Sequence, residues 1–329
     1  MRALARLHCS TKQHRQFKIA PLFDTSVFVI MVDMKDRWTV CSALTLAIAG
    51  CSAPLATAPK NETKTEMTQA TKENTMTTEK TQVRDLLKSI ETGDPAPVAA
   101  INPNKYIQHN LAAADGLAGF GALMQQLPKG SARANTARVF QDGNFVFAHT
   151  DYNFFGPKIG FDIFRFENGK IVEHWDNLQE KPAAANPSGH TMTDGPVEVR
   201  DLDKTEANKA LVESFVDDVL VNGRFEKLTS YIEGEKYTQH NPNIGDGLSG
   251  LSTAIKAMAA KGLTMRYTKI HRVLGEGNFV LTASEGTFAG VHSSFYDLFR
   301  VEAGKIVEHW DTIETIPAKK DWKNANGKF

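Results

Sequence analysis

Cysteine is scarce in this chain and is confined to its first part. The three cysteines are Cys9, Cys41 and Cys51, and none follows Cys51. The rest of the chain therefore cannot form a disulfide or a thiolate metal site, and it cannot use a cysteine nucleophile.

A net charge of either sign is also missing. The 38 Lys and Arg residues balance the 38 Asp and Glu residues, and acidic residues slightly outnumber basic ones after Cys51. This balance indicates no basic surface, so we expect no nucleic-acid partner. A composition of 41% hydrophobic and 23% charged residues is instead typical of globular domains.

The apolar run at 38–49, WTVCSALTLAIA, is too short to cross a bilayer comfortably. It follows Lys35 and Arg37 and ends at Ile48-Ala49-Gly50-Cys51, which is the layout of an export signal. This segment resembles a bacterial lipoprotein signal, which implies a lipid on Cys51 and a membrane anchor made by that lipid. An ordinary cleaved signal and an uncleaved anchor are the alternatives.

The residues around this signal are expected to lack a fold. Export signals start near an N-terminus, so residues 1–33 indicate a mis-start or a disordered leader before the signal at 34–51. Residues 52–80 contain few large apolar side chains and are predicted to form a flexible tether. We therefore expect a protein of the bacterial cell envelope, either lipid-anchored or periplasmic.

The chain contains a long internal repeat. FDIFRFENGKIVEHWD at 161–176 returns as YDLFRVEAGKIVEHWD at 296–311, and YIQHN at 106–110 returns as YTQHN at 237–241. The offset is the length of a whole domain, whereas solenoid and propeller units recur every ~20–50 residues. The sequence therefore predicts a tandem duplication of one domain.

The expected boundaries follow from composition. The first domain is placed at 81–182 and the second at 204–318, joined by a Pro/Gly/Ser-rich linker at 183–203. The polar tail at 319–329 is expected to fray. Because one chain then offers two copies of the same sheet, we expect the copies to pair as an internal pseudo-dimer.

Each repeat changes rhythm along its length. Segments with helical spacing, such as 83–92 and 116–128, come first, and β-rich runs follow them. Turn sequences such as Asp142-Gly143-Asn144 and Glu167-Asn168-Gly169 separate these runs and indicate hairpins. We predict an α+β fold in which helices pack on one face of a curved antiparallel sheet.

Asp162 breaks the hydrophobic pattern of its strand. Alternation places it on one face with Phe164 and Phe166, and places Phe161 and Ile163 on the other. The carboxylate either lies at the rim of the sheet or is held by an arginine, or it lines an apolar cavity. In a cavity, desolvation would raise its pKa toward that of a useful general base.

The histidines leave similar alternatives open. His109 is either a solvated loop residue or a site residue, and His149 on a strand is either a core histidine or a site residue. His174-Trp175-Asp176 recurs as His309-Trp310-Asp311. Its tryptophan suits the core, and its charged residues suit ion pairs or a pocket. The histidines show no helical i, i+4 spacing, so no metal site is predicted.

Tyr-x-Gln-His-Asn, Asp-Gly-Leu-x-Gly and the long repeated motif together resemble the SnoaL-like branch of the nuclear transport factor 2-like superfamily. The resemblance covers both repeats. It implies two tandem cone-shaped domains, each with a bent antiparallel sheet wrapped around helices and a deep, mostly apolar pocket. SnoaL-type polyketide cyclases use an aspartate and histidines in that pocket to close a ring by an aldol reaction.

The resemblance also implies site residues. The catalytic candidates are Asp162, His149, His109, Asp297 and His240. The residues expected to line the pocket or to be structural are Tyr106, His174, Trp175, Asp176, Tyr237, His292, His309 and Asp311. Ala283 stands where the first repeat has His149, with Glu285 and His292 as approximate substitutes, so we expect the first domain to be the better-equipped site.

Two functions follow from these expectations. The first is cofactor-independent acid/base catalysis, an isomerisation or aldol-type cyclisation of a small apolar carbonyl compound. The alternative is an envelope-tethered protein that binds a small ligand or a partner without catalysis. Superfamily members serve in both roles, so the fold does not decide between them.

Overall fold

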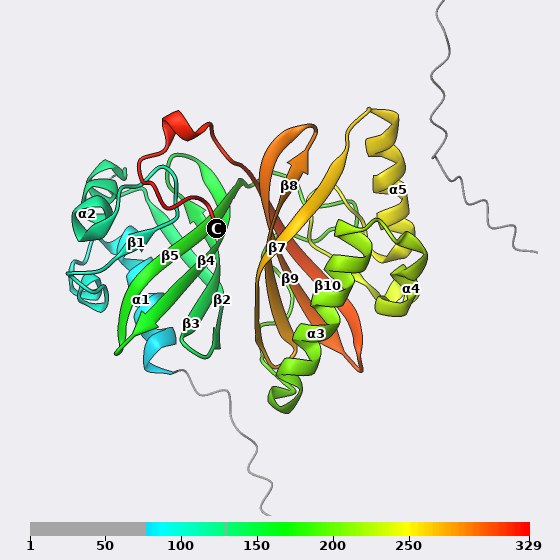
Figure 1. The fold of residues 1–329 in the computed structure, drawn as a ribbon, viewed down its shortest axis with the longest axis horizontal. Helices are drawn as coiled ribbons and strands as arrows, with labels where there is room; N and C mark the ends of the chain where they lie inside the picture. Colours follow the sequence, from blue (N-terminus) through cyan, green and yellow to red (C-terminus); the bar gives the residue numbers. More distant parts are fainter. Residues whose placement is uncertain (1–76, 129) are drawn as a thin grey trace, which may run out of the picture. The chain divides into compact units, whose positions relative to one another are not determined.

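The computed structural model describes residues 77–128 and 130–329 (Figure 1). The expected leader, the signal with Cys51 and most of the tether lie outside these residues. Thr78, Glu79 and Lys80, which the sequence placed in the tether, instead form the first turn of helix α1. Among the described helices, none has the length and hydrophobicity needed to cross a membrane.

In the first domain the helices precede the four long strands, as the change of rhythm predicts. Helix α1 (Thr78–Thr92) begins after Thr77, whose hydroxyl accepts a hydrogen bond from the backbone N–H of Lys80. The remaining helical elements and the first short strand are η1 (Ala96–Ala100), β1 (Ile107–Gln108) and α2 (Gly116–Gln126). Four long strands follow: β2 (Arg133–Asp142), β3 (Phe145–Asn153), β4 (Pro157–Glu167) and β5 (Lys170–Glu180).

The second domain has the same plan with a longer helical part. Its helical elements are η2 (Leu202–Lys204), α3 (Thr205–Phe215), the π-helical turn η3 (Val216–Val221), η4 (Phe225–Lys227), α4 (Leu228–Tyr231), η5 (Gly234–Lys236) and α5 (Gly247–Ala260). Its strands are β6 (Thr238–Gln239), β7 (Met265–Glu276), β8 (Phe279–Phe288), β9 (Val291–Glu302) and β10 (Lys305–Thr315). The tail contains η6 (Lys319–Asp321).

Each domain contains one five-stranded sheet, in the orders β1-β5-β4-β3-β2 and β6-β10-β9-β8-β7. The long strands pair antiparallel, and the short strand of each domain pairs in parallel with the last one. The β4–β5 hairpin turns at Asn168 and Gly169, whose φ angles are 50° and 71°. Such paired positive angles suit the tight hairpin that this sequence predicts. The predicted α+β fold of two tandem cones is confirmed.

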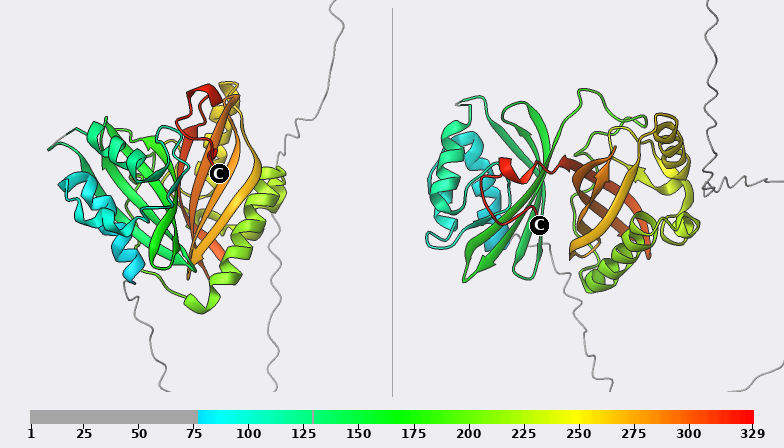
Figure 2. Two further views of the ribbon diagram at one scale, coloured as in Figure 1. Left: turned by 60° about the vertical axis from the view of Figure 1, so that its left-hand side comes forward. Right: turned by 45° about the horizontal axis from the view of Figure 1, so that its top comes forward.

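Helices cover one face of each sheet and leave the other face to the partner domain (Figures 1 and 2). The uncovered faces share one apolar core, which includes Phe140, Phe161 and Trp175 of the first domain and Phe279, Tyr296 and Trp310 of the second. Two cation–π contacts across it are reciprocal. The Arg138 guanidinium lies 4.3 Å from the ring centre of Trp310, and that of Arg272 lies 4.0 Å from Trp175.

The segments that follow β5 and β10 are held by hydrogen bonds. Asn186 Nδ2 donates to the carbonyl of Gln239 in the second domain, and Asn324 Nδ2 donates to the carbonyl of Asn110 in the first. Lys328 is buried, with Nζ 2.5 Å from a carboxylate oxygen of Glu314. The expectation that the tail frays is therefore wrong, because its polar side chains bond to groups of both domains.

Candidate functional site

Two carboxylates face each other on the helix-covered side of the first sheet. Asp162 on β4 is the cross-strand partner of Asp176 on β5. Both line a cavity of about 270 Å³. Most of its wall is apolar and includes Leu86, Ile90, Phe120, Met124, Phe154, Phe164 and Leu178. The sequence leaves the position of Asp162 open, and the structure places its carboxylate in the cavity.

Hydrogen bonds satisfy most of the polar floor of this cavity, although the buried Asp176 Oδ1 has no hydrogen-bond partner among the described residues. Tyr152 Oη donates to Asp162 Oδ2 at 2.7 Å, and Nε2 of His174 lies 3.2 Å from Asp162 Oδ1. Asn110 Nδ2 donates to Asp176 Oδ2 at 2.5 Å. Buried carboxylates need such partners because desolvation of an unpaired charge is costly.

Gln108 fixes the tautomer of His174. Its Oε1 accepts the backbone N–H of Asn110 at 2.9 Å, which identifies this atom as the carbonyl oxygen. Nδ1 of His174 lies 2.9 Å from the same oxygen and must carry a hydrogen. The exchangeable proton of the pair therefore lies between Nε2 of His174 and Oδ1 of Asp162, where it can be given to or taken from a ligand.

The second domain repeats this arrangement around a cavity of about 230 Å³. Asp297 on β9 faces Asp311 on β10, and Nε2 of His309 lies 3.0 Å from Asp297 Oδ1. Nδ1 of His309 lies 3.0 Å from Oε1 of Gln239, which also accepts the backbone N–H of Asn241. Asn241 Nδ2 donates to both oxygens of Asp311. The two cavities therefore hold the same Asp–His pair with the same fixed tautomer.

The tyrosine of each site comes from a different strand. Tyr152 lies on β3 opposite Ala134 of β2, whereas Tyr267 lies on β7 opposite Gly286 of β8. The Tyr267 hydroxyl donates to Asp297 at 3.1 Å, as the Tyr152 hydroxyl donates to Asp162 in the first domain. The two tyrosines therefore occupy opposite members of equivalent cross-strand pairs. An alignment of the two repeats does not match one with the other.

Burial changes the protonation of these groups. Desolvation raises the pKa of Asp162, although the hydrogen bonds from His174 and Tyr152 oppose this rise. In the second domain, desolvation raises the pKa of Asp311 to about 6, and the charge of His309 opposes the rise. Burial alone would lower the pKa of His309, but its hydrogen bond to Asp297 and the nearby aspartates raise it overall. Burial therefore lets each of these aspartates hold its proton at a higher pH than a solvated aspartate does.

Tyr106 and Tyr237 also line the two cavities. Burial raises the pKa of both hydroxyls, so each stays protonated.

Lys328 from the tail reaches the first site, where its Nζ lies 3.5 Å from Asp176 Oδ1.

His149 lies on the opposite face from Asp162. It pairs across the strands with Phe161 and stacks on its ring at 4.3 Å, whereas Asp162 pairs with Ala148. Burial lowers the pKa of His149 well below its ordinary value, and the charge of Arg138 lowers it further. The expectation that His149 shares a cavity with Asp162 is wrong, because alternation turns its neutral ring toward the other domain.

His109 and His240 also lie outside the cavities. His109 stacks on Trp175 and His240 on Trp310, both with ring centres 4.6 Å apart. Nε2 of His109 lies 2.9 Å from the Glu173 carboxylate, on the face of the sheet that meets the other domain. The structure therefore does not bring either histidine to the aspartates expected to act with them.

The second site is as complete as the first. Ala283 removes nothing from it, because the equivalent His149 is not a cavity residue. His292 is half-exposed and its Nε2 lies 2.7 Å from Glu285 Oε1, away from the cavity lining. The expectation of a better-equipped first domain is wrong.

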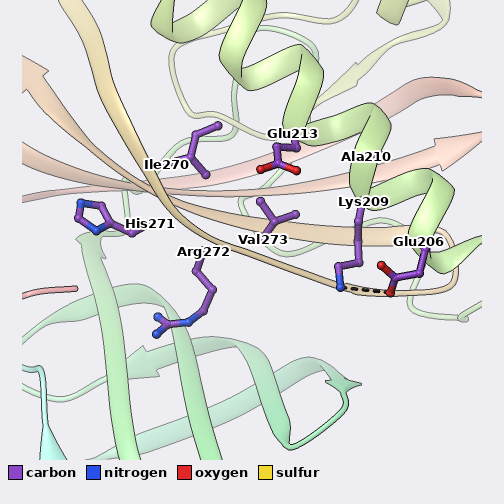
Figure 3. Close-up of a pocket in the computed structure, with 8 residues that line it drawn as sticks. All are labelled: Glu206, Lys209, Ala210, Glu213, Ile270, His271, Arg272 and Val273. Atoms are coloured by element: carbon purple, nitrogen blue, oxygen red, sulfur yellow. Dashed lines mark hydrogen bonds and ion pairs between the residues drawn. The ribbon is translucent and has the colours of Figure 1, made fainter.

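Another hollow lies between α3 and β7 and differs in character (Figure 3). Charged side chains of α3 line it, and Lys209 pairs there with Glu206 at 3.2 Å. Figure 3 also shows Arg272 on β7 pointing away from the helix, where it stacks on Trp175 of the first domain. This open hollow lacks the apolar wall that surrounds each Asp–His pair.

Asp162, His174 and Asp176 offer ligand atoms within 4.8 Å of one another, so their spacing could also hold a cation. A cation there would compete with the hydrogen bonds from Tyr152 and Asn110. The donor set therefore suits proton transfer within the existing network at least as well as metal binding.

Comparison with known proteins supports the sequence resemblance in part. Residues 212–309 match the family model described as a SnoaL-like domain. No curated protein matches the chain.

Solved structures similar to single domains share little sequence with this chain. TsrD from Streptomyces laurentii is 18% identical over 31% of this chain and 88% of its own, with a TM-score of 0.28. IdmH from Streptomyces antibioticus, a candidate polyketide cyclase, is 16% identical over 31% and 91%, with a TM-score of 0.27. An NTF-2 like protein of unknown function from Burkholderia xenovorans LB400 is 17% identical over 32% and 87%, with a TM-score of 0.29.

Proposed function

We propose that both cavities are active sites for cofactor-independent acid/base chemistry on a small apolar carbonyl compound. The reaction class is isomerisation or aldol-type cyclisation. The observation that carries this proposal is the Asp–His pair with a fixed tautomer on the floor of an apolar cavity, present in both domains.

In the proposed mechanism, the Asp162 carboxylate removes a proton beside the substrate carbonyl. His174 keeps the hydrogen on Nδ1 and donates it to Gln108. Nε2 faces Asp162, accepts the proton that Asp162 has removed and can return it to a different atom of the substrate. The Tyr152 hydroxyl holds the carboxylate in place. Asp297, His309 and Tyr267 take the same roles in the second domain.

The size of the cavities favours a small substrate. Their volumes, about 270 and 230 Å³, lie below the roughly 300–1,000 Å³ of pockets that enclose drug-sized ligands. The apolar walls favour a hydrocarbon body, and the polar floor provides one place for a carbonyl group.

The test is exchange of α-protons into deuterated water across a panel of small ketones and aldehydes. The wild type should catalyse exchange, and the double variant Asp162→Asn, Asp297→Asn should lose at least 100-fold, the lower end of a general-base contribution. His292→Gln, outside both cavities, is the matched control and should retain the wild-type rate. Failure of the wild type to exchange any compound in the panel would contradict catalysis.

The alternative is a binding protein that uses the same cavities. Large exposed apolar side chains support it, because Phe155 lines the first cavity and Phe225, Ile255 and Met265 line the second. In that case ligand affinity would survive the double variant and no exchange would occur.

We further propose that Cys51 carries a lipid that tethers the protein to the cell envelope. The support is the sequence layout at 35–51. Mass spectrometry of the membrane fraction should find acyl chains on Cys51, and Cys51→Ser should move the protein out of that fraction. We also propose that the two domains act as an internal pseudo-dimer, supported by their shared apolar core.

A further inference from the structure

Another group of ligand-type side chains lies where the segment between the domains packs on the second domain. His190, Asp194 and His240 each offer one atom, and these atoms lie within 4.8 Å of one another. Nδ1 of His240 lies 2.8 Å from Asp194 Oδ1, and Nδ1 of His190 lies 3.5 Å from Asp194 Oδ2. Two imidazole nitrogens and a carboxylate oxygen are donors that Zn²⁺ prefers.

A carboxylate also orients each imidazole from its far side. Nε2 of His190 lies 3.1 Å from Asp246 Oδ2, and Nε2 of His240 lies 2.9 Å from Glu308 Oε1. A carboxylate in this position keeps the hydrogen on Nε2 and increases the basicity of the other nitrogen. Both rings therefore present Nδ1 toward Asp194. Metal-bound histidines likewise donate their other ring N–H to a carboxylate or a carbonyl group.

Solvent access fits a reversible site. The side chains of His190 and Asp194 are partly exposed, at 31% and 43%, while that of His240 is buried. Nδ1 of His240 also lies 2.9 Å from the carbonyl oxygen of Thr191. An ion bound at Nδ1 would take the place of this contact.

The first domain provides an internal comparison. His109 stacks on Trp175 as His240 stacks on Trp310, but its Nδ1 faces the carbonyl of Gly327 at 2.9 Å. That carbonyl belongs to the tail and takes the place that Thr191 and Asp194 have in the second domain. In the first domain the stacked His109 holds only a polypeptide segment, the tail at Gly327. In the second domain the segment that the stacked His240 holds also provides two further ligand side chains, His190 and Asp194.

We propose that His190, Asp194 and His240 bind a Zn²⁺ ion, with water completing its coordination. The ion fastens the segment between the domains to the second domain. This proposal is independent of the chemistry in the two cavities.

The test is titration of the full-length, chelator-treated protein with Zn²⁺, and with Co²⁺ to report coordination by visible absorption. We expect one site for each chain and a rise in thermal stability on Zn²⁺ addition. His190→Ala, a partly exposed position, should weaken Zn²⁺ binding at least tenfold, and Asp246→Asn, which leaves the ligands intact, about 10- to 100-fold.

Two controls separate this site from others. His292→Ala removes a histidine elsewhere and should leave the affinity unchanged, and Asp162→Asn should do the same because it changes only the first cavity. Wild-type protein that binds no Zn²⁺, or His190→Ala protein that binds it as tightly as the wild type, would overturn the proposal. Loss of binding in Asp162→Asn with retention in His190→Ala would place the ion in the cavity and overturn it as well.

Discussion

Asp297 Oδ1 lies 3.0 Å from Nε2 of His309 on the floor of an apolar cavity, and Asp162 and His174 make the same contact at 3.2 Å. The hydroxyl that supports each aspartate comes from a different strand in the two domains. The Asp–His contact is therefore present in both domains although the tyrosine that supports it lies on a different strand in each.

The pH dependence of exchange should report the Asp162 carboxylate. Its pKa is raised, mainly by desolvation, and the hydrogen bond from Tyr152 opposes the rise. Activity should therefore increase with pH through a value above the ordinary aspartate pKa. In an Asp297→Asn background, Tyr152→Phe removes the opposing bond and should move this acidic limb to higher pH. Superimposable profiles with and without Tyr152 would contradict the assignment of Asp162 as the base.

Asp311 should make the folded state less stable as the pH rises. Its pKa is about 6 in the folded protein and 3.8 in the reference state. The folded state thus holds the proton more tightly, and this stabilisation, present below the unfolded pKa, is lost as the pH rises through the folded pKa. The loss amounts to about 3 kcal/mol. Asp311→Asn cannot ionise, so its free energy of unfolding should fall less across that range.

Urea unfolding at about pH 4 and about pH 6.5 measures this difference. The exposed Asp203→Asn variant is the control and should follow the wild type. If Asp311→Asn also followed the wild type, the carboxyl would not have the raised pKa that its burial implies.

The reciprocal tryptophans should dominate the contact between the domains. Trp175 and Trp310 are almost fully buried, and each lies beneath an arginine of the other domain. Trp175→Ala and Trp310→Ala should each reduce the free energy of unfolding by about 3–5 kcal/mol. Substitution of the partly exposed Trp322 by alanine should cost far less, and equal losses at all three positions would contradict a shared core.

Lys328 should stabilise the fold through a tail that the sequence alone would leave frayed. Its buried ammonium pairs with Glu314 and lies near Asp176. Removing one partner of a buried ion pair costs about 3–5 kcal/mol, so Lys328→Met should be strongly destabilising in urea unfolding. Lys320→Met, an exposed lysine of the same tail, is the matched control. Equal stability of the two variants would show that the tail does not dock.

Strand alternation puts Asp162 on one face with Phe164 and Phe166 but leaves the sheet rim and a cavity as alternatives. The face follows from the two-residue period within a strand, whereas the cavity depends on the helices that cover the sheet. The error at His149 came from the next level, the register between β3 and β4, which pairs it with Phe161. A shift of one residue in register turns a side chain to the opposite face, and residue spacing alone does not give the register.

Local sequence pattern does not predict the residues that hold each Asp–His pair in place. Gln108 reaches His174 through the parallel pairing of β1 with β5, which joins segments far apart in the sequence. The repeated Tyr-x-Gln-His-Asn motif marks this region, but residue type favours its histidine over the neighbours Gln108 and Asn110, which make the contacts to His174 and Asp176. Tyr152 and Tyr267 left no repeat signal, because they occupy opposite members of a cross-strand pair.

¹⁵N NMR of the His174 and His309 imidazoles tests the proposed proton pairs most directly. Nδ1 of both rings should carry a hydrogen, which the amide oxygen of Gln108 or Gln239 accepts, and Nε2 should be the nitrogen that faces the aspartate. Asp162→Asn and Asp297→Asn should each change the Nε2 signal of the histidine in the same domain alone. An Nδ1 without a hydrogen, or an Nε2 signal that does not respond to either substitution, would contradict the Asp–His pair as the source of acid/base chemistry.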